Sequence, residues 1–141
     1  MTFTRVQDLD SPQPTAGPLR ALVVEDDRNT RRMICVVLAQ EGFEACEAVD
    51  GVDAIEEVRN GGYALVVLDL RMPNIDGVGV MEYIRRHRPS ALRNILVTSA
   101  LPPADMKRLC DPDICNLLPK PFDIEELRRL ARECAAGSEE S

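Results

Sequence analysis

The sequence has no tryptophan, only two tyrosines and three phenylalanines, and a single histidine, His87. A lone histidine without a second histidine or a cysteine nearby makes a poor transition-metal site, so we interpret His87 as a surface residue. No apolar run approaches the length that crosses a membrane, and the first residues lack the apolar segment of a signal peptide. We therefore expect a cytoplasmic protein that has no membrane partner.

The five cysteines show no C-x-x-C spacing, which excludes the usual zinc and redox motifs. Their odd number gives no disulfide framework either. Cys35 and Cys46 lie in apolar or alternating stretches, where a buried thiol behaves as a small apolar side chain. We expect all the cysteines to be reduced and structural, including Cys110, Cys115 and Cys134.

Positive charge is in the minority, with 17 Lys and Arg against 24 Asp and Glu, which gives a net charge of −7. Nucleic-acid affinity depends mostly on Lys and Arg that neutralise phosphates, so this balance argues against direct nucleic-acid binding. The basic run 85–88 falls in an expected helix and is typical of a solvated face. A length of 141 residues accommodates one globular domain and leaves no room for a separate catalytic domain.

Short apolar runs alternate along the chain with segments of helical periodicity. Continuous runs of Val, Leu and Ile are typical of strands that are buried on both faces of a parallel sheet. The repeat therefore predicts a doubly wound α/β fold with five parallel strands and right-handed crossovers. The strands are expected at 21–24, 43–48, 64–68, 95–97 and 114–118, and the helices at about 27–42, 52–59, 78–88, 104–110 and from 123 onward.

Capping signals mark several helix ends. Asp27 or Asn29 can cap the first helix, and Asp123 with Glu126 forms the pattern of a capping box before the last helix. Residues 1–18, which contain several prolines and no periodicity, are expected to be a flexible leader. The folded domain is then 19–136, followed by a disordered acidic tail, 137–141.

Four of the expected strands end in polar residues of different chemical kinds. Glu25 and Asp26 follow the first strand, Asp69 the third, Thr98 the fourth and Lys120 the fifth. The carboxyl ends of parallel strands meet at one edge of such a sheet, so these side chains are expected to converge. Each alone could be an ordinary cap or turn residue, but together they predict a site.

The chemistry of this group favours magnesium and phosphate. Crowded carboxylates repel one another unless a cation lies between them, and Mg²⁺ prefers hard oxygen ligands with positions left for a phosphoryl group. A carboxylate can itself accept phosphate as an acyl phosphate, and Asp69, on the central strand, is our candidate acceptor. Lys120 and the Thr98 hydroxyl suit phosphoryl oxygens.

Four motifs together resemble the receiver domain of two-component response regulators, including the single-domain chemotaxis regulator. They are Leu22-Val23-Val24-Glu25-Asp26-Asp27, Asp69-Leu70-Arg71-Met72-Pro73-Asn74-Ile75-Asp76-Gly77, Val97-Thr98-Ser99-Ala100 and Lys120-Pro121-Phe122. The resemblance spans about Leu19 to Arg132 and implies a flavodoxin-like sheet with strand order 2-1-3-4-5.

The resemblance also implies a role for each residue of the site. Asp69 corresponds to the phosphoacceptor, Asp26 to a direct Mg²⁺ ligand, and Glu25 to an acid that acts largely through water. The backbone carbonyl of Arg71 corresponds to a further metal ligand. Thr98 corresponds to the switch hydroxyl and Lys120, with a cis Lys120–Pro121 peptide bond, to the lysine that contacts phosphate.

Partners follow from the same resemblance. A sensor histidine kinase or a histidine phosphotransfer protein would supply the phosphate, which hydrolyses slowly. Phosphorylation would then change the face formed by the fourth helix, fifth strand and fifth helix, where a target protein binds. The chain ends soon after the last expected helix, so we expect a signalling module without its own DNA-binding domain or separate enzyme activity. A longer protein that contains the same domain stays open.

Two departures from the family pattern concern this face. Leu117 stands where the fifth strand usually has an aromatic residue, three positions before the lysine. Asp111-Pro112-Asp113-Ile114 replaces the usual Gly-Ala entry to that strand.

Two other functions compete with signalling. A magnesium-dependent phosphatase of the haloacid dehalogenase type also uses an Asp nucleophile, but it needs a second acid where this chain has Arg71. The other alternative is a receiver-like scaffold that is not phosphorylated, against which the complete acidic, Thr and Lys set argues.

Overall fold

The computed structural model describes residues 18–72 and 74–140, with side chains described up to residue 135. Five strands alternate with five α-helices and one 3₁₀ helix. The elements are β1 (Arg20–Val24), α1 (Arg28–Gln40), β2 (Glu44–Ala48), α2 (Gly51–Asn60), β3 (Leu65–Asp69), α3 (Gly77–His87), η1 (Pro89–Asn94), β4 (Ile95–Ser99), α4 (Pro103–Leu109), β5 (Asn116–Pro119) and α5 (Ile124–Glu140). Residues 1–17 of the expected leader lie outside the described residues.

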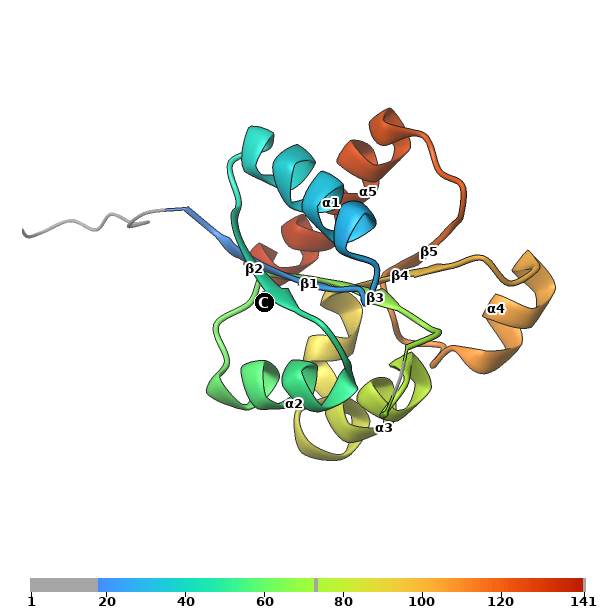
Figure 1. Ribbon diagram of the computed structural model, residues 1–141. Helices are drawn as coiled ribbons and strands as arrows, with labels where there is room; N and C mark the ends of the chain where they lie inside the picture. Colours follow the sequence, from blue (N-terminus) through green and yellow to red (C-terminus); the bar gives the residue numbers. More distant parts are fainter. Residues whose placement is uncertain (1–17, 73, 141) are drawn as a thin grey trace, which may run out of the picture.

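All five strands are parallel and lie in the order β2-β1-β3-β4-β5, which confirms the predicted fold. Helices α1 and α5 cover one face of the sheet and α2 and α3 the other, while α4 lies beyond the β5 edge (Figure 1). Among the described residues, no helix is long and apolar enough to cross a membrane.

Alternate side chains along the strands pack into two hydrophobic cores, one on each face of the sheet. In β1, Ala21 and Val23 pack with α1 and α5, whereas Leu22 and Val24 pack with α2 and α3. Because β1, β3 and β4 are covered on both sides, nearly every side chain in them is buried. This explains why these strands are continuous apolar runs rather than alternating ones.

Helix N-termini differ in how well the sequence predicts them. Asp27 caps α1 by accepting a hydrogen bond from the Thr30 amide. The capping box expected at α5 is wrong, because Asp123 accepts from the Glu125 amide while Glu126 pairs with Arg129 instead. The Glu126 carboxylate pairs with the Arg129 guanidinium, so it does not turn back to accept from the backbone N–H of Asp123.

Several element boundaries also differ from the prediction. Residues 89–94, where no helix is expected, form η1, which begins at Pro89. The fifth strand starts at Asn116 rather than Ile114, because pairing with β4 begins at Leu96 and Asn116. Helix α5 continues to Glu140, across the acidic segment expected to be disordered, since one glycine weakens a helix far less than a proline would.

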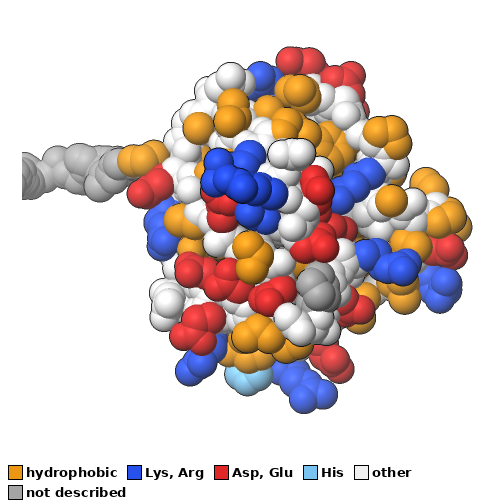
Figure 2. All heavy atoms as spheres, viewed as in Figure 1, with side chains coloured by type: hydrophobic (Ala, Val, Ile, Leu, Met, Phe, Trp, Pro, Cys, Tyr) orange, Lys and Arg blue, Asp and Glu red, His pale blue; other side chains and the backbone are white. Residues whose placement is uncertain are grey.

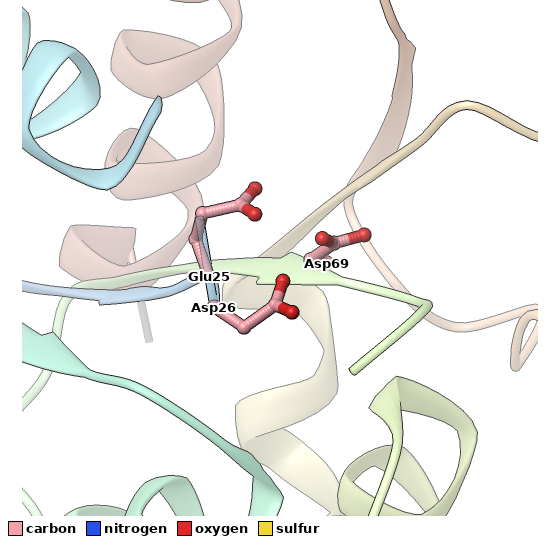
Figure 3. A group of neighbouring side chains, drawn as sticks. All are labelled: Glu25, Asp26 and Asp69. Carbon is pink, nitrogen blue, oxygen red and sulfur yellow. The ribbon is translucent and has the colours of Figure 1, made fainter. Parts of the chain in front are cut away.

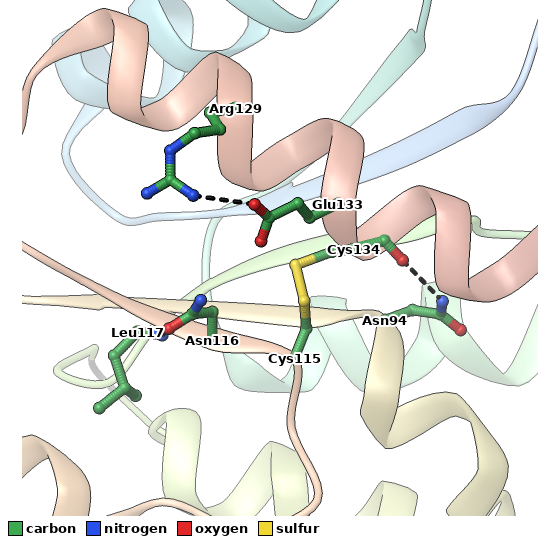
Figure 4. Close-up of a disulfide and its surroundings, with 7 residues drawn as sticks. All are labelled: Asn94, Cys115, Asn116, Leu117, Arg129, Glu133 and Cys134. Atoms are coloured by element: carbon green, nitrogen blue, oxygen red, sulfur yellow. Dashed lines mark hydrogen bonds and ion pairs between the residues drawn. A yellow bond between two sulfur atoms is a disulfide. The ribbon is translucent and has the colours of Figure 1, made fainter.

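The cysteine prediction is wrong for two of the five residues. Cys115, just before β5, forms a disulfide with Cys134 of α5, with 5.6 Å between their Cα atoms (Figure 4). The side-chain amide of Asn94 donates to the Cys134 carbonyl beside it. The two cysteines are 19 residues apart and meet only because α5 packs back across β5, so no local spacing signals the bond. Cys35, Cys46 and Cys110 are free thiols.

Candidate functional site

Three carboxylates lie together where β1 and β3 end. Glu25 and Asp26 follow the last residue of β1, and Asp69 is the last residue of β3, the neighbouring strand. One carboxylate oxygen of each lies within 4.8 Å of those of the other two. Figure 3 shows the three side chains where β1 and β3 end, with the carboxylates of Glu25 and Asp26 extending toward the side of Asp69. In Figure 2, acidic side chains gather on the central part of the face over this region.

The three acids differ in their exposure to solvent. The residues Glu25 and Asp69 are only 2% and 4% exposed, whereas Asp26 is exposed. Two buried carboxylates with a third at the surface form a site that a small cation can enter from solvent. Hard oxygen ligands in this number suit a divalent ion such as Mg²⁺.

Lys120 brings an ammonium group to the same place. Its Nζ lies 2.7 Å from Oε1 of Glu25 and 3.3 Å from Oδ2 of Asp69. Its backbone N–H donates to the carbonyl of Ser99, and the following Lys120–Pro121 peptide bond is cis, as the resemblance implies. The lysine therefore offsets part of the negative charge of the two buried acids.

Burial and ion pairing act in opposite directions on these groups. Burial raises the pKa of Glu25, and the bonds from Lys120 and from the Asp27 amide only partly reverse this, so the net shift is upward. Burial lowers the pKa of Lys120, but its bond to Glu25 and the charge of Asp69 outweigh that effect and raise it. The environment therefore favours the protonated, charged form of Lys120, and it disfavours the ionised form of Glu25 relative to a carboxylate in water.

Thr98 and Arg71 flank Asp69 through the backbone. Thr98 on β4 is buried and is the strand partner of Asp69, and its carbonyl accepts from the Leu70 amide. The Arg71 amide donates to Oδ1 of Asp69 at 3.2 Å, while its side chain is exposed. One carboxylate oxygen of Asp69 thus meets a backbone donor and the other meets Lys120.

The loop after β3 shows why a glycine is required at position 77. A Cβ at Gly77 would lie 2.5 Å from the carbonyl oxygen of Asp69 and 2.8 Å from the Cα of Leu70. Asn74, in the same loop, has a left-handed backbone with a φ of 66°, and its side-chain amide donates to Oδ2 of Asp50. Gly77 therefore lets the start of α3 pack directly against the backbone of Asp69.

An open cavity of about 380 Å³ adjoins the acidic group on the side of Lys120. Apolar side chains of α1 and of the segment after β5 line it together with the lysine. Its residues are Thr30, Met33, Ala100, Lys120, Pro121 and Phe122.

The α4–β5 region has structure of its own at the positions where the sequence departs from the family. Leu117, in place of the usual aromatic residue, packs partly buried against the α2–α3 core. The Arg85 guanidinium of α3 binds both Asp111 and Asp113, with Nε 2.9 Å from Oδ2 of Asp111. The Arg85 contact lowers the pKa of Asp111. The loop before β5 is therefore tied to α3 by an ion-pair clamp.

Comparison with known proteins identifies the family. The profile of the response regulator receiver domain matches residues 21–132. The chain belongs to this family. The receiver domain is 35% identical over 109 residues to the transcriptional regulatory protein TctD of Salmonella typhimurium and 32% identical over 108 residues to the response regulator ArlR of Staphylococcus saprophyticus. Each alignment covers 77% of this chain and 48% of the relative, so the chain spans about half the length of these curated relatives.

Solved structures show the same fold. The receiver domain of Francisella response regulator 1452 is 24% identical, with a TM-score of 0.75 over 85% of this chain and 98% of that one. The response regulator TrrA from Thermotoga maritima, solved in complex with Mg(2+)-BeF, is 30% identical, with a TM-score of 0.71 over 82% and 97% of the two chains. The protein is thus a phospho-accepting receiver domain, and the phosphatase alternative is not favoured.

Sequence reasoning missed one residue beside the site, Arg31 of α1. It is buried, and it contacts the carbonyl of Glu25. A signal was present, because Arg31 lies three and seven residues before Ile34 and Leu38 on the inward stripe of α1. A charged residue on an apolar stripe indicates a buried polar contact.

Proposed function

We propose that Asp69 is the phosphoacceptor of this receiver domain. The observation that carries the proposal is the convergence of three carboxylates and the Lys120 ammonium at one edge of the sheet. A carboxylate oxygen of Asp69 attacks the phosphorus of a phosphohistidine; the new O–P bond forms as the P–N bond breaks, and the electron pair leaves with the imidazole. The acyl phosphate formed in this way is later hydrolysed slowly by water.

The side chains of Glu25, Asp26 and Asp69 and the backbone carbonyl of Arg71 are the proposed ligands of Mg²⁺. The carboxylates supply the hard oxygens that this ion prefers, and the Mg(2+)-BeF complex of the relative TrrA supports the choice. When bound, the ion neutralises negative charge that builds up on the phosphoryl oxygens. Asp26, the exposed member, is the proposed direct ligand, and Glu25 is proposed to act largely through water.

Lys120 and Thr98 are proposed to bind the phosphoryl oxygens. The Lys120 ammonium already lies 3.3 Å from Oδ2 of Asp69, so it would need to move little to donate to an oxygen of a phosphoryl group on Asp69. The Thr98 hydroxyl, on the neighbouring strand position, would turn toward the phosphoryl group and change the start of the β4–α4 loop. The clamp formed by Arg85 ties the loop before β5 to α3, so it would restrain how far that side of the domain moves when Thr98 turns.

The proposed phosphodonor is a sensor histidine kinase or a histidine phosphotransfer protein in the cytoplasm. The open cavity beside Lys120 supports this, because Met33 and Phe122 offer an apolar rim to a docking helix next to the acceptor. The proposed target binds the face formed by α4, β5 and α5 after phosphorylation. We propose 19–136 as the extent of the domain.

Incubation with acetyl phosphate and Mg²⁺, followed by a phosphate-affinity gel, tests the acceptor. Wild type should give a retarded band that EDTA abolishes, and Asp69→Asn should give none. Asp27→Asn is the matched control, because Asn caps a helix as well as Asp does and the change removes one nearby charge. A full-strength retarded band from Asp69→Asn would show that another residue accepts the phosphate.

A further inference from the structure

Arg31 is the one cationic side chain that is buried among the described residues, with 8% of its surface exposed. It lies on the inward face of α1 and makes two contacts that point in different directions. Its Nε donates to Oε1 of Glu47 on β2 at 2.6 Å, and its Nη1 donates to the backbone carbonyl of Glu25 at 2.8 Å. Burial of a charged side chain carries a desolvation penalty, which is offset only where its hydrogen-bonding partners are well placed.

The contact with Glu25 acts on the peptide group that leads to Asp26. The Glu25 N–H donates to the carbonyl of Ala48 at 3.2 Å, so the Glu25 backbone is held on one side by β2 and on the other by Arg31. The carboxylate of Asp26 accepts no hydrogen bond from any residue in the described part of the chain. Its position therefore depends on where the backbone of Glu25 and Asp26 is held.

We propose that Arg31, oriented by Glu47, is a positioning residue that holds this backbone so that Asp26 and Glu25 face the cation. The inference rests on the proposed magnesium site. Arg31 reaches the site only through the Glu25 carbonyl, and it works because a guanidinium presents N–H groups in two directions at once. A lysine ammonium at the same place would have to satisfy Glu47 and the carbonyl from a single point.

Arg32 offers a matched control for this proposal. It is the next residue of α1, it pairs with the same Glu47 at 3.6 Å, and its side chain is 58% exposed. It makes no hydrogen bond to Glu25 among the described residues. Arg31→Met and Arg32→Met therefore each remove one positive charge and one of the two cations that pair with Glu47. Only Arg31→Met also removes the hydrogen bond to the Glu25 carbonyl.

Calorimetric titration of MgCl₂ into the full chain tests the proposal without any phosphorylation. Loss of a side chain that orients metal ligands lowers metal affinity by about 10- to 100-fold, so the Kd for Mg²⁺ should rise at least about tenfold in Arg31→Met. Arg32→Met should stay within about twofold of wild type, as expected of an exposed ion pair. Equal Kd values in the two variants would overturn the proposal.

Two further measurements separate positioning from a folding defect. Arg31→Lys keeps the charge and should give a Kd between those of wild type and Arg31→Met, while far-ultraviolet circular dichroism checks that each variant is folded. In the acetyl phosphate assay, the Mg²⁺ concentration that gives half the maximal rate should rise, while the rate at saturating Mg²⁺ stays near the wild-type value. A lower saturating rate with an unchanged half-maximal concentration would count against positioning.

The outcome is independent of the identity of the acceptor. If Asp69→Asn is still phosphorylated, the proposed acceptor is wrong, yet the Mg²⁺ titrations of the Arg31 and Arg32 variants keep their meaning. If Asp69→Asn is not phosphorylated and Arg31→Met binds Mg²⁺ like wild type, the proposed function stands and the role of Arg31 fails.

Discussion

The Lys120 ammonium lies closer to Glu25 than to Asp69, with Nζ 2.7 Å from Oε1 of the former and 3.3 Å from Oδ2 of the latter. Before phosphorylation, the lysine therefore compensates an acid that we assign to the metal site as well as the proposed acceptor. The Lys120 ammonium contacts two buried carboxylates, and its distances to them can change when a phosphoryl group is added to Asp69.

Replacement of Lys120 should affect both stability and phosphorylation. In Lys120→Met the buried Glu25 carboxylate loses its ionic partner, so the free energy of unfolding should fall by about 1–3 kcal/mol in urea titrations. Phosphorylation by acetyl phosphate should slow by about 100-fold, because a charged donor to the developing phosphoryl charge is lost. Lys107→Met, at an exposed lysine of α4, is the control and should change neither quantity.

A second substitution checks the physical reason. Glu25→Gln in the Lys120→Met background removes the uncompensated charge and should recover part of the lost stability, without recovery of phosphorylation. Additive losses in the double variant would mean that Lys120 and Glu25 do not stabilise each other.

The raised pKa of Glu25 predicts a specific pH dependence of stability. Between the ordinary value of 4.5 and the higher folded value, the folded state binds more protons at Glu25 than the unfolded chain does. The free energy of unfolding contributed by this group therefore decreases as pH rises through that window. Urea titrations of wild type and Glu25→Gln between about pH 4 and pH 6.5 should show that the variant gains stability relative to wild type as pH rises. A constant difference across this range would contradict the raised pKa.

Removal of Asp26 should separate metal binding from the stability of the free protein. Mg²⁺ at ten times its Kd should raise the free energy of unfolding of wild type by about 1.4 kcal/mol. Asp26→Asn should lose this response, and without Mg²⁺ it should be at least as stable as wild type because one of three neighbouring negative charges is gone. NaCl at matched ionic strength controls for screening, and an equal Mg²⁺ response in both proteins would exclude Asp26 as a ligand.

The bond between Cys115 and Cys134 should be visible both chemically and thermodynamically. Alkylation of the unreduced, denatured protein followed by mass spectrometry should label Cys35, Cys46 and Cys110 and leave the other two unlabelled. Reduction should lower the free energy of unfolding by about 3 kcal/mol, the loop-closure value for a loop of this length. A Cys115→Ala, Cys134→Ala variant should not respond to reductant, and labelling of all five cysteines before reduction would rule the disulfide out.

The sequence was sufficient for the architecture because the signals involved are local. Runs such as Leu65–Leu68 are apolar at every position, which indicates burial on both faces of a sheet, and a capping residue, Asp27 or Asn29, marks the start of α1 to within a few positions. The convergence of Glu25, Asp26 and Asp69 also follows from order along the chain, since parallel strands bring their carboxyl ends to one edge.

Contacts between side chains distant in the sequence were decided only by the tertiary structure. Glu25 and Lys120 are 95 positions apart and Cys115 and Cys134 are 19 positions apart, and no periodicity in the sequence pairs either couple. Arg31 illustrates the same difference. Its position on the inward stripe of α1 follows from the helical spacing of the sequence, but its contact with the Glu25 carbonyl depends on how α1 packs against β1 and β2. Short-range spacing determines which face of an element a residue occupies, whereas packing of the elements determines which atoms meet there.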